Sequence, residues 1–258
     1  MDRRRIALAV VVAAVTVAAI VVIAFPITRA PAFHHYADQR SWLGIPHAGD
    51  VLSNLPFLIA GVWFLLRADT AYAKLACLGI AAVGIGSGAY HIEPSDVTLA
   101  FDWGPIAIAL MLVTAAVIDD RLGERAGRIA VIVGPLLAIG SVVLWLATGG
   151  TGAIDAGATH GAGTVTPYGA VQALGIALPP LVALVAPGKV PVRPLLLAVL
   201  FFALARLCAA HDQRLLTAIG VSGHSLKHIA AAIAAGFGLH ALTARVTSRA
   251  SRASLSSS

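Results

Sequence analysis

Long apolar stretches separated by short polar segments dominate the chain. The first covers residues 6–25 and follows three consecutive arginines, Arg3, Arg4 and Arg5. Seven more stretches follow, each close to the ~20 residues that a helix needs to cross a bilayer. Their ranges are 50–66, 74–90, 98–118, 127–146, 165–185, 194–210 and 221–243. This pattern predicts an all-α polytopic membrane protein with eight spans.

The first apolar stretch has two interpretations, a signal peptide or a retained span. The apolar region of a signal peptide covers only about 7–15 residues, which is shorter than residues 6–25. The best small-residue cleavage site, Thr28-Arg29-Ala30, is followed directly by Pro31. We therefore interpret residues 1–30 as a cytoplasmic N-terminus and a transmembrane helix that stays in the protein.

Composition supports a membrane protein and excludes several other classes. Of the 258 residues, 59% are hydrophobic and 12% are charged, whereas soluble domains carry about 25% charged residues. The net charge of +6 does not indicate nucleic-acid binding, because the basic residues lie between apolar stretches instead of clustering. Two cysteines are too few for a disulfide framework. We expect a membrane lipid as partner, no nucleic acid, and no protein partner.

The basic residues also predict the orientation in the membrane. Cytoplasmic segments carry an excess of lysine and arginine. With the N-terminus inside, the inner segments hold Arg3, Arg4, Arg5, Arg67, Lys74, Arg121, Arg125, Arg128, Lys189, Arg193, Arg245, Arg249 and Arg252. The outer loops hold only Arg29, Arg40 and Arg214, with Arg206 near an outer end. Both termini are therefore expected in the cytoplasm, with residues 245–258 forming a disordered tail.

Polar residues in four of the predicted spans fall at a common depth. Because successive spans run in opposite directions, residues near the outer ends of different helices meet at one level. The set consists of Ser53, Asn54, Ser87, His91, Asp102, His224 and His228. Polar side chains inside a membrane are costly and need partners, so their convergence predicts a functional site.

Three histidines of this set have the spacing of metal ligands. His224 and His228 are four residues apart, so in a helix they project from one face. His91 would supply a third nitrogen, which leaves one open position on a tetrahedral zinc ion, as in catalytic sites. The alternative is that the histidines lie at the water interface and are hydrogen-bonded to their neighbours.

A serine and a carboxylate accompany the histidines. Asp102 would accept the proton of a zinc-bound water molecule, orient that water, or take the place of a metal ligand, and Ser87 would donate a hydrogen bond to a developing oxyanion. Alternatively, Asp102 pairs with Lys227 or Arg206, and Ser87 bonds to a carbonyl of its own helix. Trp103 would pack against a substrate chain or belong to the aromatic belt at the membrane interface.

These residues resemble the motifs of a known family. Ser87-Gly88-Ala89-Tyr90-His91, Asp102 eleven residues later, and His224-Ser225-Leu226-Lys227-His228 are similar to the motifs of the alkaline ceramidase family. Asp50-Val51-Leu52-Ser53-Asn54 resembles the first-helix motif of that family, which ends in Ser-Asn. The family belongs to a wider superfamily of membrane hydrolases that includes the adiponectin and progestin receptors. The resemblance extends from about Asp38 to the last predicted helix.

The resemblance implies both a fold and an activity. It implies a seven-helix hydrolase core over residues 31–244, with the N-terminal span as an addition. It implies zinc on His91, His224 and His228, and a reaction centre at Ser87 and Asp102. The reaction would hydrolyse the amide of a ceramide-like lipid to a long-chain base and a fatty acid. Substrate contacts are expected from Ser53, Asn54 and Trp103.

The location implied is a bacterial inner membrane, with the active site towards the outer, periplasmic leaflet. Two other functions would use the same polar residues. A lipid-binding receptor or sensor of this superfamily would keep zinc as a structural ion without turnover. A transporter would need internal repeats and acidic residues on several helices, and the sequence has neither.

A second metal is implied for the segment before the first core span. Eukaryotic members of the family have an acidic calcium-binding stretch there. Here the segment offers Asp38, Trp42 and Asp50, with Gln39 and His47 where further acidic residues would be expected. Calcium takes several oxygen ligands, so Asp38 and Asp50 are the carboxylates that it would use.

Further histidines lie outside the predicted spans. His34, His35, His47, His160 and His211 fall in outer loops, where we expect solvated side chains, with His34 and His35 near an entrance. They are not expected to be metal ligands.

Overall fold

The computed structural model describes residues 2–27, 34–150 and 163–244. Within these ranges, eight helices are long and apolar enough to cross a membrane, which confirms the predicted number of spans and indicates an integral membrane protein. The expectations for residues 28–30, for His160 and for the tail 245–258 lie outside the described residues.

The long helices form most of the structure. They are α1 Arg3–Ala24, α4 Ala71–Ile92, α5 Asp96–Leu122, α6 Glu124–Trp145, α7 Thr166–Val185, α8 Val192–Ala210 and α10 Gly223–Thr243. The remaining span consists of two pieces, α2 Ala48–Leu52 and α3 Leu55–Leu65, and a π-helical turn, η2 Leu146–Gly150, continues α6. Helix α9, Asp212–Ile219, was not predicted from the sequence, because its eight residues contain no long apolar stretch. None of these residues is buried in the structure.

The break between α2 and α3 has a local cause. Pro56 is the second residue of α3; it has no backbone N–H, and its ring clashes with the carbonyl four residues earlier. The backbone carbonyl of Asp50 instead accepts hydrogen bonds from Ser53 Oγ at 3.0 Å and Asn54 Nδ2 at 2.8 Å. The predicted single helix over residues 50–66 is therefore interrupted, and both polar side chains stay at the break.

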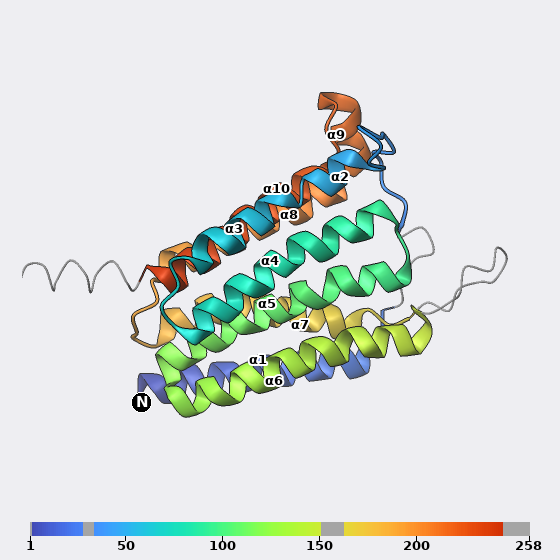
Figure 1. Cartoon of the computed structure of the whole chain (residues 1–258). Coiled ribbons are helices and arrows are strands. Elements are labelled where there is room, and N and C mark those ends of the chain that lie inside the picture. The colour runs from blue at the N-terminus through green and yellow to red at the C-terminus, as the bar shows by residue number, and fades with distance from the viewer. Residues whose placement is uncertain (1, 28–33, 151–162, 245–258) are drawn as a thin grey trace, which may run out of the picture.

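The helices lie side by side in one bundle (Figure 1), with α4 and α5 in its middle. Helices α3, α8 and α10 lie on one side of this pair, and α1 and α6 lie on the other. Burial agrees with this arrangement. In an apolar 18-residue stretch of α5, 61% of the residues are buried inside the protein, whereas in that of α1 only 6% are. Helix α5 is therefore central, whereas α1 lies at the edge of the bundle and has few buried residues.

Two glycines allow the helices around α4 to approach closely. A Cβ atom on Gly86 would overlap the backbone carbonyl of Phe101 on α5, and one on Gly84 would lie 2.8 Å from the backbone nitrogen of Leu58 on α3. Small residues permit such close packing of helices in lipid. Gly88 does not act in this way, since a Cβ atom there would lie 4.0 Å from its nearest neighbour, the backbone carbonyl oxygen of Val51.

The helix ends bring the polar residues to one end of the bundle. Helix α4 ends at Ile92, and α5 begins at Asp96, after three intervening residues, under a capping box formed by Ser95 and Thr98. Helix α10 begins under its N-cap residue Ser222. These helix ends lie with α2 and α9 at the end of the bundle opposite the N-terminus of α1 (Figure 1).

Candidate metal centre and adjoining cavity

The rings of His91, His224 and His228 surround one point. The ring centroid of His91 lies 4.8 Å from that of His224 and 4.9 Å from that of His228. The centroids of His224 and His228 are 4.7 Å apart. Each residue offers one ligand atom within 4.8 Å of the other two. His91 and His228 are buried and His224 is half-buried. The α4 end and the first two turns of α10 therefore form a three-histidine cluster.

The nitrogen atoms fit a metal ion. His91 Nε2 and His224 Nε2 are 3.2 Å apart, close to the separation of about 3.4 Å expected for two ligands of a tetrahedral zinc ion. His228 Nε2 and His91 Nδ1 are buried without a hydrogen-bond partner. Buried polar atoms normally have partners, so this cluster could hold a metal ion, which would engage the ring nitrogen of His228.

Two residues at the helix break hold the third histidine. Ser53 Oγ lies 2.9 Å from His228 Nδ1, and Asn54 Nδ2 lies 3.2 Å from the same atom. Partners of this kind orient a ligating imidazole and leave its other nitrogen for the metal. Neither residue is among those that line the cavity described below. The position of Ser53 and Asn54 therefore indicates that they orient His228, and it does not support the expected contact between these two residues and a substrate.

Asp102 and Ser87 lie beside the cluster. Both are buried, at 5% and 2% exposure, and the Ser87 hydroxyl hydrogen-bonds to the Asp102 carboxylate. The Oδ1 atom of Asp102 has no hydrogen-bond partner. Within the described residues, no ion pair of 4.0 Å or less joins Asp102 to Lys227 or Arg206. The carboxylate therefore keeps one oxygen available inside the protein.

A cavity of about 600 Å³ opens from this point into the bundle. Ser87, Asp102 and His228 line one part of it, and apolar side chains of α5, α7, α8 and α10 line most of the remainder. Along α10 the lining extends from His224 to Gly238, which corresponds to roughly 21 Å of helix. The volume lies within the range of ligand sites, roughly 300–1,000 Å³. The cavity is long, narrow and apolar, as an acyl chain requires.

Trp103 belongs to the wall of this cavity. Its side chain is 8% exposed, stacks on Tyr168 at 4.3 Å with an interplanar angle of 9°, and lies 4.8 Å from Trp145. An interface-belt tryptophan would face the lipid headgroups. That alternative is therefore wrong for Trp103, because packing among α5, α6 and α7 buries the ring.

Tyr36 covers the histidines from the loop before α2, a role that no pattern in the sequence predicts. Its ring lies 4.9 Å from that of His91 and 4.1 Å from that of His224, and its hydroxyl is 2.5 Å from the hydroxyl of Tyr90. Burial, followed by the proximity of Tyr90, raises the pKa of Tyr36 well above its ordinary value. Tyr36 is therefore a neutral, hydrogen-bonded cover over the cluster.

His34 is also engaged with the bundle. Its Nδ1 atom lies 2.9 Å from the Tyr90 hydroxyl and its Nε2 atom 3.0 Å from Asp96 Oδ1. The expectation that His34 is solvated is wrong, because this segment folds back onto α4 and α5. His35, its neighbour in the chain, is exposed as expected.

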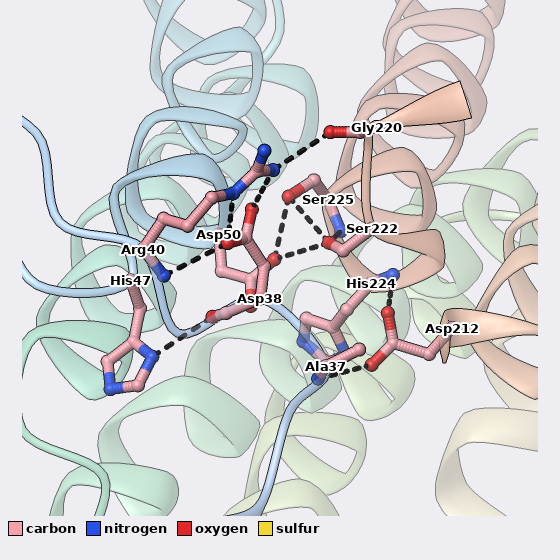
Figure 2. A network of polar contacts seen from close by, with 10 residues as sticks. All are labelled: Ala37, Asp38, Arg40, His47, Asp50, Asp212, Gly220, Ser222, His224 and Ser225. Carbon is pink, nitrogen blue, oxygen red and sulfur yellow. Dashed lines mark hydrogen bonds and ion pairs between the residues drawn. The ribbon is translucent and has the colours of Figure 1, made fainter. Parts of the chain in front are cut away.

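A network of hydrogen bonds (Figure 2) ties this loop to the start of α10. Asp212, the first residue of α9, accepts hydrogen bonds from the backbone nitrogens of Ala37 and His224 at 3.0 and 2.9 Å. Asp50 Oδ1 accepts hydrogen bonds from the hydroxyls of Ser222 and Ser225 at 3.0 and 2.7 Å. Two carboxylates therefore fix the N-terminus of the helix that carries two of the three histidines.

Asp38 and Asp50, the two expected calcium ligands, lie in the same network. A Cβ on Gly49 would lie 3.1 Å from Asp38 Oδ2 and 3.0 Å from Ser225 Oγ, so the two carboxylates share one neighbourhood. However, Arg40 donates to both oxygens of Asp38, at 2.7 and 2.6 Å. These hydrogen bonds hold the pKa of Asp38 below its ordinary value.

The donor set of this loop does not fit a calcium ion. Calcium takes 6–8 oxygen ligands, and a guanidinium already engages Asp38. Asp50 Oδ2 is the one carboxylate oxygen of the pair without a hydrogen-bond partner. The guanidinium of Arg40 already supplies the positive charge that a calcium ion would bring to Asp38. Arg40 also donates a hydrogen bond to the carbonyl of Gly220 at 2.8 Å.

The structure brings together the histidines, the serine and the carboxylate that the sequence predicts to converge, and it adds Tyr36 and Asp212 from segments outside the predicted spans. No protein-family model, no curated protein and no solved structure matches the chain.

Proposed function

We propose that the protein is a zinc-dependent intramembrane hydrolase that cleaves the amide bond of ceramide-like lipids to a long-chain base and a fatty acid. One observation carries the proposal. A three-histidine cluster stands beside a buried serine and carboxylate, at one end of a long apolar cavity. Three histidines with an open fourth position are typical of catalytic zinc, and the cavity suits an acyl chain.

We propose that the chain is a bacterial member of the alkaline ceramidase family. In this interpretation the seven spans from α2/α3 to α10 form the hydrolase core, and α1 is an addition at its side. The low burial of α1, 6% against 61% for α5, supports this division. So does the origin of the cluster, which uses side chains of α4 and α10 and their neighbours in α2, α3 and α5.

The chain's own residues would perform the proton transfers. Asp102 accepts a proton from water as the water oxygen attacks the amide carbonyl, and it returns the proton to the leaving nitrogen. Ser87 donates a hydrogen bond to the oxygen on which negative charge develops. Tyr36 closes the cluster on the loop side, which limits access of bulk water to the reacting bond. The carbon–nitrogen bond breaks, and a fatty acid and an amine result.

Zinc is the ion that the donors fit best. Imidazole nitrogens suit zinc, copper, iron and nickel, and a tetrahedral arrangement with one open position favours zinc. His91, His224 and His228 would hold it, with Ser53 and Asn54 behind His228. When bound, the ion would polarise the amide carbonyl and activate water.

We propose that both termini face the cytoplasm and that the cluster faces the periplasmic leaflet of a bacterial inner membrane. The excess of basic residues in the segments on the N-terminal side supports this orientation. The cluster lies at the end of the bundle opposite the N-terminus of α1 (Figure 1), consistent with an outer position.

The decisive experiment combines metal removal with a matched pair of variants. The purified full-length protein is treated with a chelator, reloaded with zinc, and incubated with radiolabelled ceramides and other N-acyl lipids. We expect fatty-acid release that stops with the chelator and returns with zinc. His228→Ala should lose both metal and turnover. His240→Ala, on the same helix but roughly 18 Å away along its axis, should keep both.

Two results would oppose the proposal in different ways. Unchanged turnover in the metal-free protein or in His228→Ala would contradict the metal-dependent mechanism. Saturable lipid binding without any turnover by the zinc-loaded protein would instead favour a receptor or sensor with a structural ion.

A further inference from the structure

The cavity carries more positive charge than a neutral lipid amide requires. Among the residues that line it, Lys227 and Arg206 are cations, and Asp102 is the one carboxylate. A divalent ion on the histidines would add to this imbalance. Unpaired charge inside a membrane protein is expensive and marks ion or substrate sites. An anionic group on the ligand would supply the missing partner.

Lys227 lies next to the centre of the cluster. It is on α10, one turn after His224, and its Nζ atom is 2.9 Å from His224 Nε2. Within the described residues, no carboxylate lies within 4.0 Å of it as an ion-pair partner. An ammonium group has three donors and no acceptor. If His224 gives its Nε2 to a metal ion, the lysine loses this acceptor and is left facing the cavity.

Arg206 lies at the opening of the same cavity. It is one turn before the end of α8, and its side chain is exposed although it lines the cavity. No hydrogen bond or ion pair involves Arg206 in the part of the chain that the structure describes. A guanidinium binds carboxylate and phosphate groups through two parallel hydrogen bonds. The alternative occupant is the headgroup phosphate of a surrounding lipid, towards which arginines extend.

The positions of the cations fix which part of a ligand would carry the charge. The apolar lining continues from the cluster along α10 to Gly238, away from Arg206. The acyl chain therefore fills the deep part of the cavity, and its amide carbonyl lies near the histidines. The group attached to the amide nitrogen remains at the end that holds Lys227 and Arg206.

We propose that the substrate is an anionic lipid amide whose carboxylate, phosphate or sulfonate is carried by the amine part and is bound by Lys227 and Arg206. This inference rests on the hydrolase function proposed above and narrows its substrate class. In the reaction, the water oxygen bonds to the carbonyl carbon, the carbon–nitrogen bond breaks, and a proton passes to the nitrogen. The products are a fatty acid and an amine that keeps the anionic group.

The experiment compares lipid amides that differ only in charge. The zinc-loaded full-length protein is given ceramide and ceramide phosphate, and N-palmitoylethanolamine, N-palmitoylglycine and N-palmitoyltaurine. We expect kcat/KM for the anionic members to exceed that for the neutral members by about tenfold or more, since hydrogen bonds to charged groups are the stronger ones. The glycine, taurine and phosphate members distinguish carboxylate, sulfonate and phosphate.

Three variants test the assigned residues. Arg206→Gln and Lys227→Met should each reduce the preference for anionic substrates by about tenfold, whereas Lys227→Arg should largely retain it. Arg214→Gln removes an exposed cation of α9 that does not line the cavity, so it should leave the preference unchanged. Metal analysis of each variant checks that the cluster remains loaded, and Arg206→Gln, on a helix that carries none of the three histidines, keeps the test valid if Lys227→Met does not fold.

Binding provides a readout that is independent of turnover. Displacement of a fluorescent N-acylglycine by N-palmitoylglycine should weaken in Arg206→Gln and at high salt, but displacement by N-palmitoylethanolamine should not. Equal or better turnover of the neutral amides, or an equal loss on all substrates in the variants, would overturn the anionic substrate class while leaving the hydrolase function intact. Failure to hydrolyse any member of the series would instead overturn the hydrolase function.

Discussion

Two polar clusters meet at the start of α10, and they differ in how well their atoms are satisfied. The loop network of Asp38, Arg40, Asp212 and the α10 cap forms hydrogen bonds to most of its donors and acceptors (Figure 2). The histidine cluster, with Asp102, leaves His91 Nδ1, His228 Nε2 and Asp102 Oδ1 without partners although they are buried. The loop network leaves one buried carboxylate oxygen, Asp50 Oδ2, without a partner, whereas the histidine cluster leaves three atoms on the groups that would bind an ion or accept a proton.

This difference distinguishes a network that stabilises the fold from a site that binds an ion or ligand. A satisfied network needs no further molecule and contributes rigidity, whereas an unsatisfied buried atom costs free energy unless an ion, water or ligand engages it. Changes in the histidine cluster should therefore alter metal content and turnover at nearly constant stability. Changes in the loop network should alter stability first. The following predictions test this division in order of decreasing effect.

Asp102→Asn should produce the largest change. It keeps the shape of the side chain but removes the proton acceptor, so turnover should fall by about 10²–10⁴-fold with metal content retained. Asp69→Asn, which changes an exposed carboxylate elsewhere, is the matched control. Turnover within a factor of two of the wild type would remove Asp102 from the chemistry.

Ser53→Ala should weaken metal binding without abolishing it. Loss of a partner behind a ligating histidine typically costs 10–100-fold in affinity, and Ser53 Oγ lies 2.9 Å from His228 Nδ1. Zinc affinity can be measured by competition with a chromophoric chelator. Ser141→Ala, a buried serine that bonds to a carbonyl of its own helix, should bind zinc normally. Equal affinity in the two variants would show that Ser53 does not orient His228.

Asp50→Asn should act mainly on stability. The carboxylate is fully buried and accepts hydrogen bonds from the hydroxyls of Ser222 and Ser225, so we expect a loss of about 1–3 kcal/mol. A double-mutant cycle with Ser225→Ala, followed by thermal unfolding in detergent, isolates the pair. Additive effects would mean that the hydrogen bond does not stabilise the start of α10. Added calcium should not compensate for either substitution.

Arg40→Gln should have the smallest effect, visible as a slightly lower melting temperature and a dependence on pH. The pKa of Asp38 is lowered in the folded protein, so its contribution is complete above the unfolded pKa and is lost as the pH falls through the folded value. The difference between wild type and Arg40→Gln should therefore persist at neutral pH and shrink progressively as the pH falls below about 4. Arg193→Gln, an exposed arginine at the other end of the bundle, is the control, and a difference that grows with acidification would contradict the assignment.

The sequence predicted the spans and the histidine cluster because both follow from periodicity. Twenty apolar residues in a row need a helix in lipid, and His224 and His228 share a face at any helical spacing of four. Because successive spans run in opposite directions, His91 is predicted to lie at the same depth in the membrane as His224 and His228. The interruption at Pro56 could also have been anticipated, since proline in a helix interior removes a backbone hydrogen bond.

Tyr36, His34 and Asp212 escaped prediction for a different reason. Tyr36 and His34 lie in a segment without periodicity, and Asp212 begins the short helix α9. The positions of all three depend on how the loop before α2 folds onto α4 and α9. A sequence contains no local signal for such long-range contacts. Lys227 was visible only as a partner for Asp102, because its place at the cavity depends on the packing of α8 against α10.

The ligands of the cluster come from helices that are far apart in the chain. His91 belongs to α4, whereas His224 and His228 belong to α10, and His224 follows His91 by 133 residues. A partly inserted chain contains only one of the three nitrogens and cannot hold an ion between helices. Capture of an ion would therefore report that α4 and α10 have both inserted and have packed against each other.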